Sequence, residues 1–222
     1  MSLNSNSAFD LGLMGGMFDP VHNGHLNIAL SSLKNLQLDE LHLLPCGTPV
    51  HRESKLAESK HRLAMLELAI SAYTELKIDD RECKTLEPSY TRNSLLAIRR
   101  ERPDCRLFFI MGQDAFNSLN NWYNWKELFS LAHIVVAARP GIVPEFAQEL
   151  QAEYQSRSVA SISELKKFDH GKILTSYFEA MDISSSRIRK CIANNESISE
   201  LVPQAVEKYL RAHNLYKGEN SF

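Results

Sequence analysis

The sequence contains no apolar run that approaches the roughly 20 residues a membrane-spanning helix needs. The first dozen residues also lack the basic start and apolar centre of a signal peptide. Positive charge is not in excess, since 25 Lys and Arg residues stand against 27 Asp and Glu residues, giving a formal net charge of -2. We therefore expect a cytoplasmic protein with no membrane or nucleic-acid partner, in which any anion site is local.

Cysteine is also scarce, with four copies scattered along the chain and no CxxC pair. Neither a disulfide framework nor a zinc site has this spacing, so we interpret the thiols as reduced side chains that pack in the interior. We accordingly expect no metal site built from protein side chains. The four residues are Cys46, Cys83, Cys105 and Cys191.

What the sequence does contain is an alternation of short apolar runs with segments of helical periodicity. Such apolar runs are expected to be buried on both faces, which predicts a doubly wound α/β fold with a parallel sheet. We expect a disordered tail over residues 1–8 and one domain over 9–222, more helical from about residue 176. Strands are expected at 9–14, 41–44, 76–78, 107–111, 134–138 and 172–174, and helices around 26–33, 63–70, 90–100, 145–155, 186–193 and 203–213.

The most informative segment is GGMFDPVHNGH over residues 15–25, between an expected strand and an expected helix. Gly15 and Gly16 let the backbone approach a ligand, and the start of the following helix offers free N–H groups to phosphate. His22 and His25 are three residues apart, so both imidazoles can face one pocket. A capping role or a metal pair are the alternatives, but no third ligand of the zinc-site kind is nearby. The segment predicts a phosphate site.

Further polar loops follow other expected strands. Those that contain Gly112 and Arg139 come directly after apolar runs, and Asp114 is placed to bond a ribose hydroxyl. In a doubly wound sheet, ligands gather beyond the carboxyl ends of the strands. We therefore expect these loops to meet the phosphate segment at one edge of the sheet.

The segment over residues 15–25 resembles the HxGH signature of the nucleotidyltransferase superfamily. Other segments narrow the resemblance to the bacterial nicotinate mononucleotide adenylyltransferases, and together they cover nearly the whole chain in the family's order. The resemblance implies a Rossmann-like nucleotidyltransferase fold with a helical C-terminal part. The further segments are PCGTPVHR at 45–52, SYT at 89–91 followed by Ser94 and Leu95, GQD at 112–114, WYNW at 122–125, RPG at 139–141 and ISSSRIR at 183–189.

The resemblance implies transfer of AMP from Mg-ATP to nicotinate mononucleotide, giving nicotinate adenine dinucleotide and pyrophosphate in NAD biosynthesis. The mononucleotide phosphate would attack the α-phosphate in line, with no covalent enzyme intermediate, because a phosphate is already an oxyanion nucleophile at neutral pH. Mg2+ would arrive on the ATP phosphates. The expected partners are these two small molecules, and the sequence leaves both a monomer and a homo-oligomer open.

The resemblance also implies a role for each matching residue. Backbone N–H groups of residues 89–91 would donate hydrogen bonds to the pyridine carboxylate and select nicotinate over nicotinamide. Trp122 would stack on the ring, whereas Trp125 is interpreted as structural. The implied catalytic residues are His22, His25 and Arg189; those implied to bind ATP are Gly15, Gly16, Met17, Phe18, Gly112, Asp114, Arg139, Ser185 and Ser186; those implied to bind the mononucleotide are His51, Arg52, Ser89, Tyr90, Thr91 and Trp122.

Two positions depart from the family pattern. Met17 stands where relatives carry Thr or Ser, which removes one hydroxyl that could contact phosphate, and Val50 replaces a proline. Three alternatives are another HxGH transferase such as a phosphopantetheine adenylyltransferase, a non-catalytic nucleotide sensor, and a fragment of a class I aminoacyl-tRNA synthetase. Trp122 and the SYT segment argue against the first, the intact histidines and Arg189 against the second, and the acidic net charge against the third.

Overall fold

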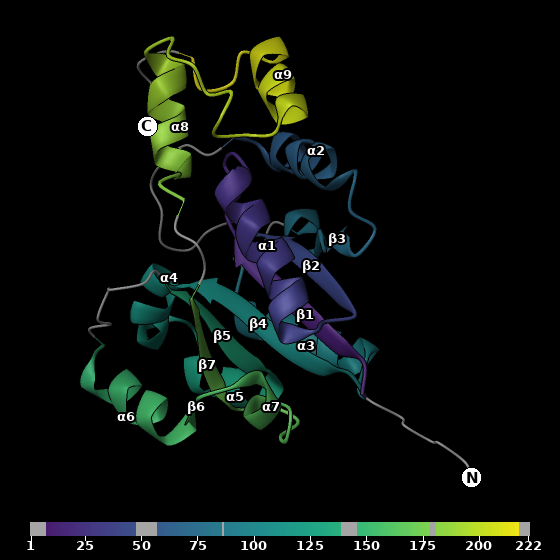
Figure 1. Ribbon diagram of the computed structural model, residues 1–222, viewed down its shortest axis with the longest axis vertical. Coiled ribbons are helices and arrows are strands. Elements are labelled where there is room, and N and C mark those ends of the chain that lie inside the picture. The colour runs from purple at the N-terminus through teal and green to yellow at the C-terminus, as the bar shows by residue number, and fades with distance from the viewer. Residues whose placement is uncertain (1–7, 48–56, 86, 139–145, 178–180, 218–222) are drawn as a thin grey trace.

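The computed structural model describes residues 8–47, 57–85, 87–138, 146–177 and 181–217. A seven-stranded parallel sheet lies between layers of helices (Figure 1). The strands follow the order β3-β2-β1-β4-β5-β7-β6, so the chain begins in the middle of the sheet and winds outward to both edges. The strands are β1 (Asp10–Gly16), β2 (Glu40–Pro45), β3 (Leu76–Ile78), β4 (Arg106–Gly112), β5 (His133–Ala138), β6 (Ser158–Val159) and β7 (Ile173–Tyr177).

Two hydrophobic clusters form the core, one on each face of the sheet. Neighbouring residues of a strand point to opposite faces, so Met14 of β1 belongs to one cluster and Leu13 to the other. The first cluster is completed by α1 (Asn23–Leu36), α2 (Ser59–Ile70), α7 (Ile162–Leu165), α8 (Ser185–Ala193) and α9 (Gln204–Ala212), and the second by α3 (Thr91–Glu101), α4 (Gln113–Asn117), α5 (Leu128–Leu131) and α6 (Gln148–Arg157). The 3-10 helices are η1 (Arg81–Lys84), η2 (Leu119–Asn121) and η3 (Trp125–Glu127).

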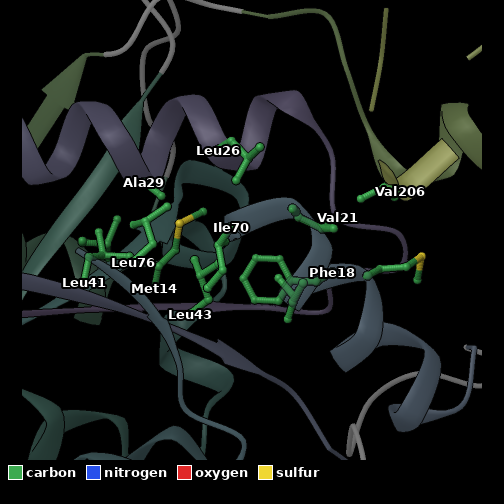
Figure 2. Packing of buried hydrophobic residues seen from close by; sticks show 14 of the residues in the cluster. Met14, Phe18, Val21, Leu26, Ala29, Leu41, Leu43, Ile70, Leu76 and Val206 are labelled. Carbon is green, nitrogen blue, oxygen red and sulfur yellow. The ribbon is translucent and has the colours of Figure 1, made fainter. Parts of the chain in front are cut away.

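The first cluster joins the C-terminal helices to the loop that follows β1, residues 17–22, which is the candidate phosphate loop. Phe18 and Val21, both fully buried, share this cluster with Val206 of α9 and with residues of α1 and α2 (Figure 2). Helix α9 also packs against α2. The C-terminal helices therefore brace the candidate phosphate loop from the face of the sheet that carries α1.

The predicted doubly wound parallel α/β fold is confirmed, and each of the expected strands is present. The sequence missed β6, since no strand was expected between residues 155 and 172. This strand pairs only Ser158 and Val159 with β7, so it is too short to show an alternating pattern. No helix in the described part of the chain is long and apolar enough to cross a membrane. Residues 1–7 of the expected tail lie outside the described residues.

Candidate active site

The loop after β1 runs over residues 17–22 at the carboxyl edge of the sheet. Phe18 has a φ of 50°, which is uncommon for a residue other than glycine, and its ring is fully buried. A methyl group at Gly16 would come within 2.8 Å of that ring, and one at Gly15 within 3.1 Å of Phe109. A side chain at Gly16 would therefore force the Phe18 ring to shift, and one at Gly15 would crowd Phe109. Phe18 can offer a ligand only its backbone.

His22 and His25 cap helix α1 as a reciprocal pair. His22 is the N-cap residue, and its Nδ1 accepts a hydrogen bond from the backbone N–H of His25 at 3.3 Å. Nδ1 of His25 in turn accepts from the backbone N–H of His22 at 3.3 Å. The rings stack with their centroids 3.6 Å apart. Capping, which the sequence offered as an alternative to phosphate contact, is thus one role that these histidines fill.

The capping geometry fixes the proton on each imidazole. Because Nδ1 is an acceptor in both rings, each neutral ring carries its proton on Nε2. Burial lowers the pKa of His22 to about 4. It also lowers the pKa of His25 well below the ordinary value, with a further contribution from the adjacent His22. The two side chains are therefore neutral hydrogen-bond donors at physiological pH.

Gly24 lies between the two histidines in sequence and against the ring of His22. A methyl group on Gly24 would lie 3.1 Å from His22 Nδ1 and 3.8 Å from Cβ of Ile183, just before α8. A side chain here would push on the capping imidazole. The glycine of the HxGH pattern thus leaves room for the capping imidazole of His22.

Helix α8 is held against the phosphate loop by hydrogen bonds. Ser184 caps the helix by accepting from the N–H of Arg187 at 3.2 Å. Ser185 donates its hydroxyl to the carbonyl of Pro20 at 3.0 Å. The buried Arg189 donates through Nη1 to the carbonyl of Asp19 at 2.7 Å and through Nη2 to Ser186 Oγ at 3.3 Å. The sequence singled out Ser185, Ser186 and Arg189 but missed Ser184, the first serine of the run.

A cavity of about 450 Å³ opens beside the phosphate loop. Gly15 and Gly16, at the end of β1, and Met17 of the following loop line one side of it. This segment therefore connects the cavity to the start of α1. Aromatic and apolar side chains dominate the remaining wall, including Trp122, whose ring meets Phe109 edge-on at 6.3 Å between centroids. The other lining residues are Leu44, Cys46, Glu82, Ser89, Tyr90, Thr91, Arg92, Phe109, Met111, Ala115, Ser118, Tyr123 and Leu128.

The SYT segment stands at the entrance of α3 on the cavity wall. Tyr90 is the N-cap residue, so the first backbone N–H groups of α3 begin at the cavity. The Ser89 hydroxyl accepts from the N–H of Gly47 at 3.0 Å, which ties this segment to the loop after β2. The ring of Tyr90 also packs at 4.7 Å from that of Tyr123. Trp125, expected to be structural, is buried in the second core cluster.

Glu82 is a buried carboxyl group on the same wall. It accepts a hydrogen bond from the Ser94 hydroxyl at 2.6 Å, which fixes η1 against α3. Burial raises the pKa of the Glu82 carboxyl above its ordinary value. Sequence reasoning had noted Ser94 only as part of the family pattern and had not noted Glu82.

Arg62, which the sequence analysis also missed, joins three parts of the site: the loop after β1, the loop after β2 and the segment that leads into α2. Its guanidinium is almost fully buried and donates to the carbonyls of Met17 at 3.0 Å, Cys46 at 2.6 Å, Gly47 at 3.3 Å and Ala57 at 3.1 Å. Arg62 lies in the buried stripe of α2, and a charged residue in line with an apolar stripe was the available signal.

The remaining predicted residues fall into two groups. Gly112 and Asp114 are exposed at the end of β4, and a methyl group on Gly112 would meet no protein atom within 4 Å. Together with the cavity and the start of α8, they lie at the carboxyl edge of the sheet, where the sequence placed them. His51, Arg52 and Arg139 lie outside the described residues, as does Val50. Among the described residues, no group of three His, Cys, Asp or Glu side chains could hold a metal ion.

The fold and the site define a nucleotidyltransferase, and comparison with known proteins agrees with that class. Residues 13–191 match the cytidylyltransferase-like family, so the chain is a nucleotidyltransferase of that class. A relative from Pseudoalteromonas atlantica, named "Probable nicotinate-nucleotide adenylyltransferase", is 40% identical over 212 residues, covering 96% of this chain and 97% of the relative. One of the same name from Pseudomonas fluorescens is 40% identical over 211 residues, covering 95% and 98%. The chain belongs to the nicotinate-nucleotide adenylyltransferase family.

Solved structures support the fold independently. Nicotinic acid mononucleotide adenylyltransferase of Plasmodium falciparum, solved in complex with NaAD, superposes with a TM-score of 0.73 over 93% of this chain and 97% of that one. The same enzyme in complex with APC gives a TM-score of 0.69. Both are 17% identical to this chain, so they show the shared fold alone.

Proposed function

We propose that the protein transfers the adenylyl group of Mg-ATP to nicotinate mononucleotide and releases nicotinate adenine dinucleotide and pyrophosphate. The observation that carries this proposal is the segment at residues 15–17, where β1 ends and the loop begins, which lines the aromatic cavity and leads into the histidine cap of α1. A mononucleotide in the cavity would place its phosphate beside an ATP held at the starts of α1 and α8. Two phosphate groups would then meet at one loop.

In the proposed reaction, an oxygen of the mononucleotide phosphate forms a bond to the α-phosphorus of ATP. The bond from that phosphorus to the oxygen bridging the β-phosphate breaks, and its electron pair leaves with pyrophosphate. No proton needs to be removed from the nucleophile, so the protein's task is to position two anions and stabilise the developing charge. Mg2+ enters as part of the Mg-ATP substrate.

The roles proposed for His22 and His25 follow from their protonation. Burial lowers the pKa of His25 well below its ordinary value and that of His22 to about 4, so at neutral pH both are neutral imidazoles that can donate Nε2–H hydrogen bonds to phosphate oxygens but hold no extra proton with which to act as general acids. Arg189 adds a permanent positive charge at the second helix start. Ser185 and Ser186 are proposed to bind the β- and γ-phosphates, although the Ser185 hydroxyl already donates to Pro20. Gly112 and Asp114 are proposed to bind the ribose of ATP.

The selectivity for nicotinate is proposed to come from the entrance of α3. The first N–H groups of a helix have no partner within the helix and carry the positive end of its dipole, which suits the pyridine carboxylate. Trp122 is proposed to stack on the ring. A hydrogen bond to a charged group is worth roughly 1.5 to 3 kcal/mol, which corresponds to roughly 10- to 150-fold discrimination per contact.

A paired turnover assay tests this selectivity. Pyrophosphate release from Mg-ATP is measured with nicotinate mononucleotide and with nicotinamide mononucleotide as acceptors. We expect kcat/KM to favour the acid by at least about tenfold. Equal efficiency with both acceptors would contradict the proposed carboxylate site, and no pyrophosphate release with either would overturn the proposed reaction.

The histidine role is tested by His22→Ala, with His61→Ala as the matched control. Loss of one transition-state donor is expected to lower kcat by about 10²- to 10³-fold. His61 lies on α2, where its Nδ1 meets the Tyr209 hydroxyl at 2.9 Å, and its replacement should leave kcat unchanged. Because His22 also caps α1, the fraction of folded protein is measured by urea unfolding and used to normalise both rates. A normalised kcat for His22→Ala close to that of wild type would refute the role.

We further propose that residues 9–222 act as a single domain. Helices α8 and α9 share the first core cluster with α1 and α2, and both hydrogen bonds from α8 to the phosphate loop cross to the N-terminal part of the chain. The site would thus be incomplete without the C-terminal part.

A further inference from the structure

Asp19 belongs to the loop after β1, and its buried carboxylate is held by the C-terminal end of the described chain. Its Oδ1 accepts a hydrogen bond from the Tyr216 hydroxyl at 2.5 Å and another from the N–H of Ala57 at 3.1 Å. Asp19 is 1% exposed and Tyr216 is 8% exposed. Tyr216 follows α9, so a residue almost 200 positions from Asp19 in sequence determines how its carboxylate is oriented.

The second carboxylate oxygen of Asp19 stops short of Arg189. Oδ2 is buried without a hydrogen-bond partner among the described residues. Arg189 Nη1 lies 3.8 Å from it and donates instead to the Asp19 backbone carbonyl at 2.7 Å. A closed ion pair would need the carboxylate to move by only about 1 Å, since such pairs have N···O distances of about 2.7–2.9 Å.

We propose that Tyr216 is a positioning residue that keeps Arg189 available to the triphosphate of ATP by restraining Asp19. While the hydroxyl holds Oδ1, the carboxylate does not turn onto the guanidinium, and the N–H groups of Arg189 not used by Asp19 or Ser186 stay directed to the substrate. This inference rests on the role of Arg189 in the proposed function.

The physical reason lies in what a buried carboxylate does when it loses a donor. A buried charge left without a hydrogen bond is costly, so the carboxylate turns to whatever donor it can reach. Without the Tyr216 hydroxyl, Oδ1 keeps the N–H of Ala57 while Oδ2 still has no partner among the described residues, so the further donor within reach is the arginine 3.8 Å away. The resulting ion pair would neutralise Arg189 and occupy one of its N–H groups, which weakens the stabilisation of charge in the transition state.

The test begins with Tyr216→Phe, which removes one hydroxyl and keeps the ring. We expect kcat to fall by at least about tenfold, while the KM for nicotinate mononucleotide changes by less than about twofold. The matched control is Tyr209→Phe, which removes a tyrosine hydroxyl from α9 that meets His61 rather than Asp19. This control should keep the wild-type kcat. Rates are normalised to the folded fraction measured by urea unfolding.

Rescue separates positioning from a merely structural contact. Asparagine at position 19 has no charge with which to capture Arg189, so Asp19→Asn combined with Tyr216→Phe should recover kcat to within about threefold of wild type. If the Tyr216 contact were only structural, the second substitution would add its own loss. Should Tyr216→Phe alone fail to fold, the double variant decides the matter, and a kcat still about tenfold or more below wild type overturns the proposal.

Arg189→Gln distinguishes failure of this inference from failure of the proposed function. If Arg189→Gln keeps the wild-type kcat, the proposed role of Arg189 is wrong and the inference fails with it. If Arg189→Gln loses activity while Tyr216→Phe keeps it, the inference alone is overturned. Loss in both single variants with recovery in the double variant supports both.

Discussion

His133 offers the most direct link between the structure and a measurable pH dependence. It opens β5 with no exposed surface, and both ring nitrogens are engaged as those of a neutral imidazole. Nε2 donates to the carbonyl of Phe168 at 2.9 Å, and Nδ1 accepts from the N–H of Lys172 at 3.2 Å. Burial lowers the pKa of His133 to about 4. A proton added to Nδ1 would break the second hydrogen bond and place a charge in the core.

Whether stability rises or falls with pH follows from how many protons His133 binds in the folded and the unfolded protein. The ordinary histidine pKa is 6.5, so between pH 6.5 and about 4 the unfolded chain binds a proton at His133 that the folded protein does not. Stability is therefore intact above pH 6.5 and falls as the pH is lowered. At about 1.4 kcal/mol per pH unit, the loss for this one residue is roughly 2 kcal/mol at pH 5.0.

The measurement compares urea unfolding of wild type and His133→Gln at pH 7.5 and pH 5.0. Glutamine does not titrate, so the fall in the free energy of unfolding between the two pH values should be smaller in the variant by about 2 kcal/mol. Carboxylates contribute equally to both proteins and cancel in this difference. An equal fall in both proteins, with unchanged urea m-values, would refute the assignment of His133 as a buried neutral group.

Three further predictions concern the site. Gly47→Ala should prevent folding or lower the free energy of unfolding by more than about 4 kcal/mol, because its Cβ would lie 1.9 Å from the Glu82 carbonyl. Gly112→Ala, whose Cβ would meet no protein atom within 4 Å, should leave the unfolding midpoint unchanged and raise only the KM for Mg-ATP. Arg62→Met leaves four backbone carbonyls without their donor, and urea unfolding should show a loss of about 3–5 kcal/mol, while a loss below about 1 kcal/mol would contradict the bridging role. Ser94→Ala removes the 2.6 Å bond to the buried Glu82, and thermal unfolding should show about 1.5–3 kcal/mol of destabilisation; no change would indicate that the carboxyl group finds another donor.

Much of the fold and the outline of the site can be predicted from the sequence alone. Runs that are apolar on both faces determine a parallel sheet, and the carboxyl edge of such a sheet is where its loops must gather. The segment over residues 15–25 is local, so its strand, loop and helix start follow from the spacing of glycines and histidines. These features depend on neighbours in the chain, and the predicted strands and HxGH loop accordingly appear where expected.

Tertiary structure decided what lies behind that segment. The buried positions of Arg62 and Glu82, the hydrogen bond from Ser185 to the Pro20 carbonyl, and the contact of Tyr216 with Asp19 all depend on elements that are distant in sequence. A charged side chain in a pattern of apolar residues shows that a partner must exist, but not which carbonyl or carboxylate supplies it. The sequence by itself predicted which residues would contact phosphate, and only the packed structure shows which of their polar groups already have partners within the protein.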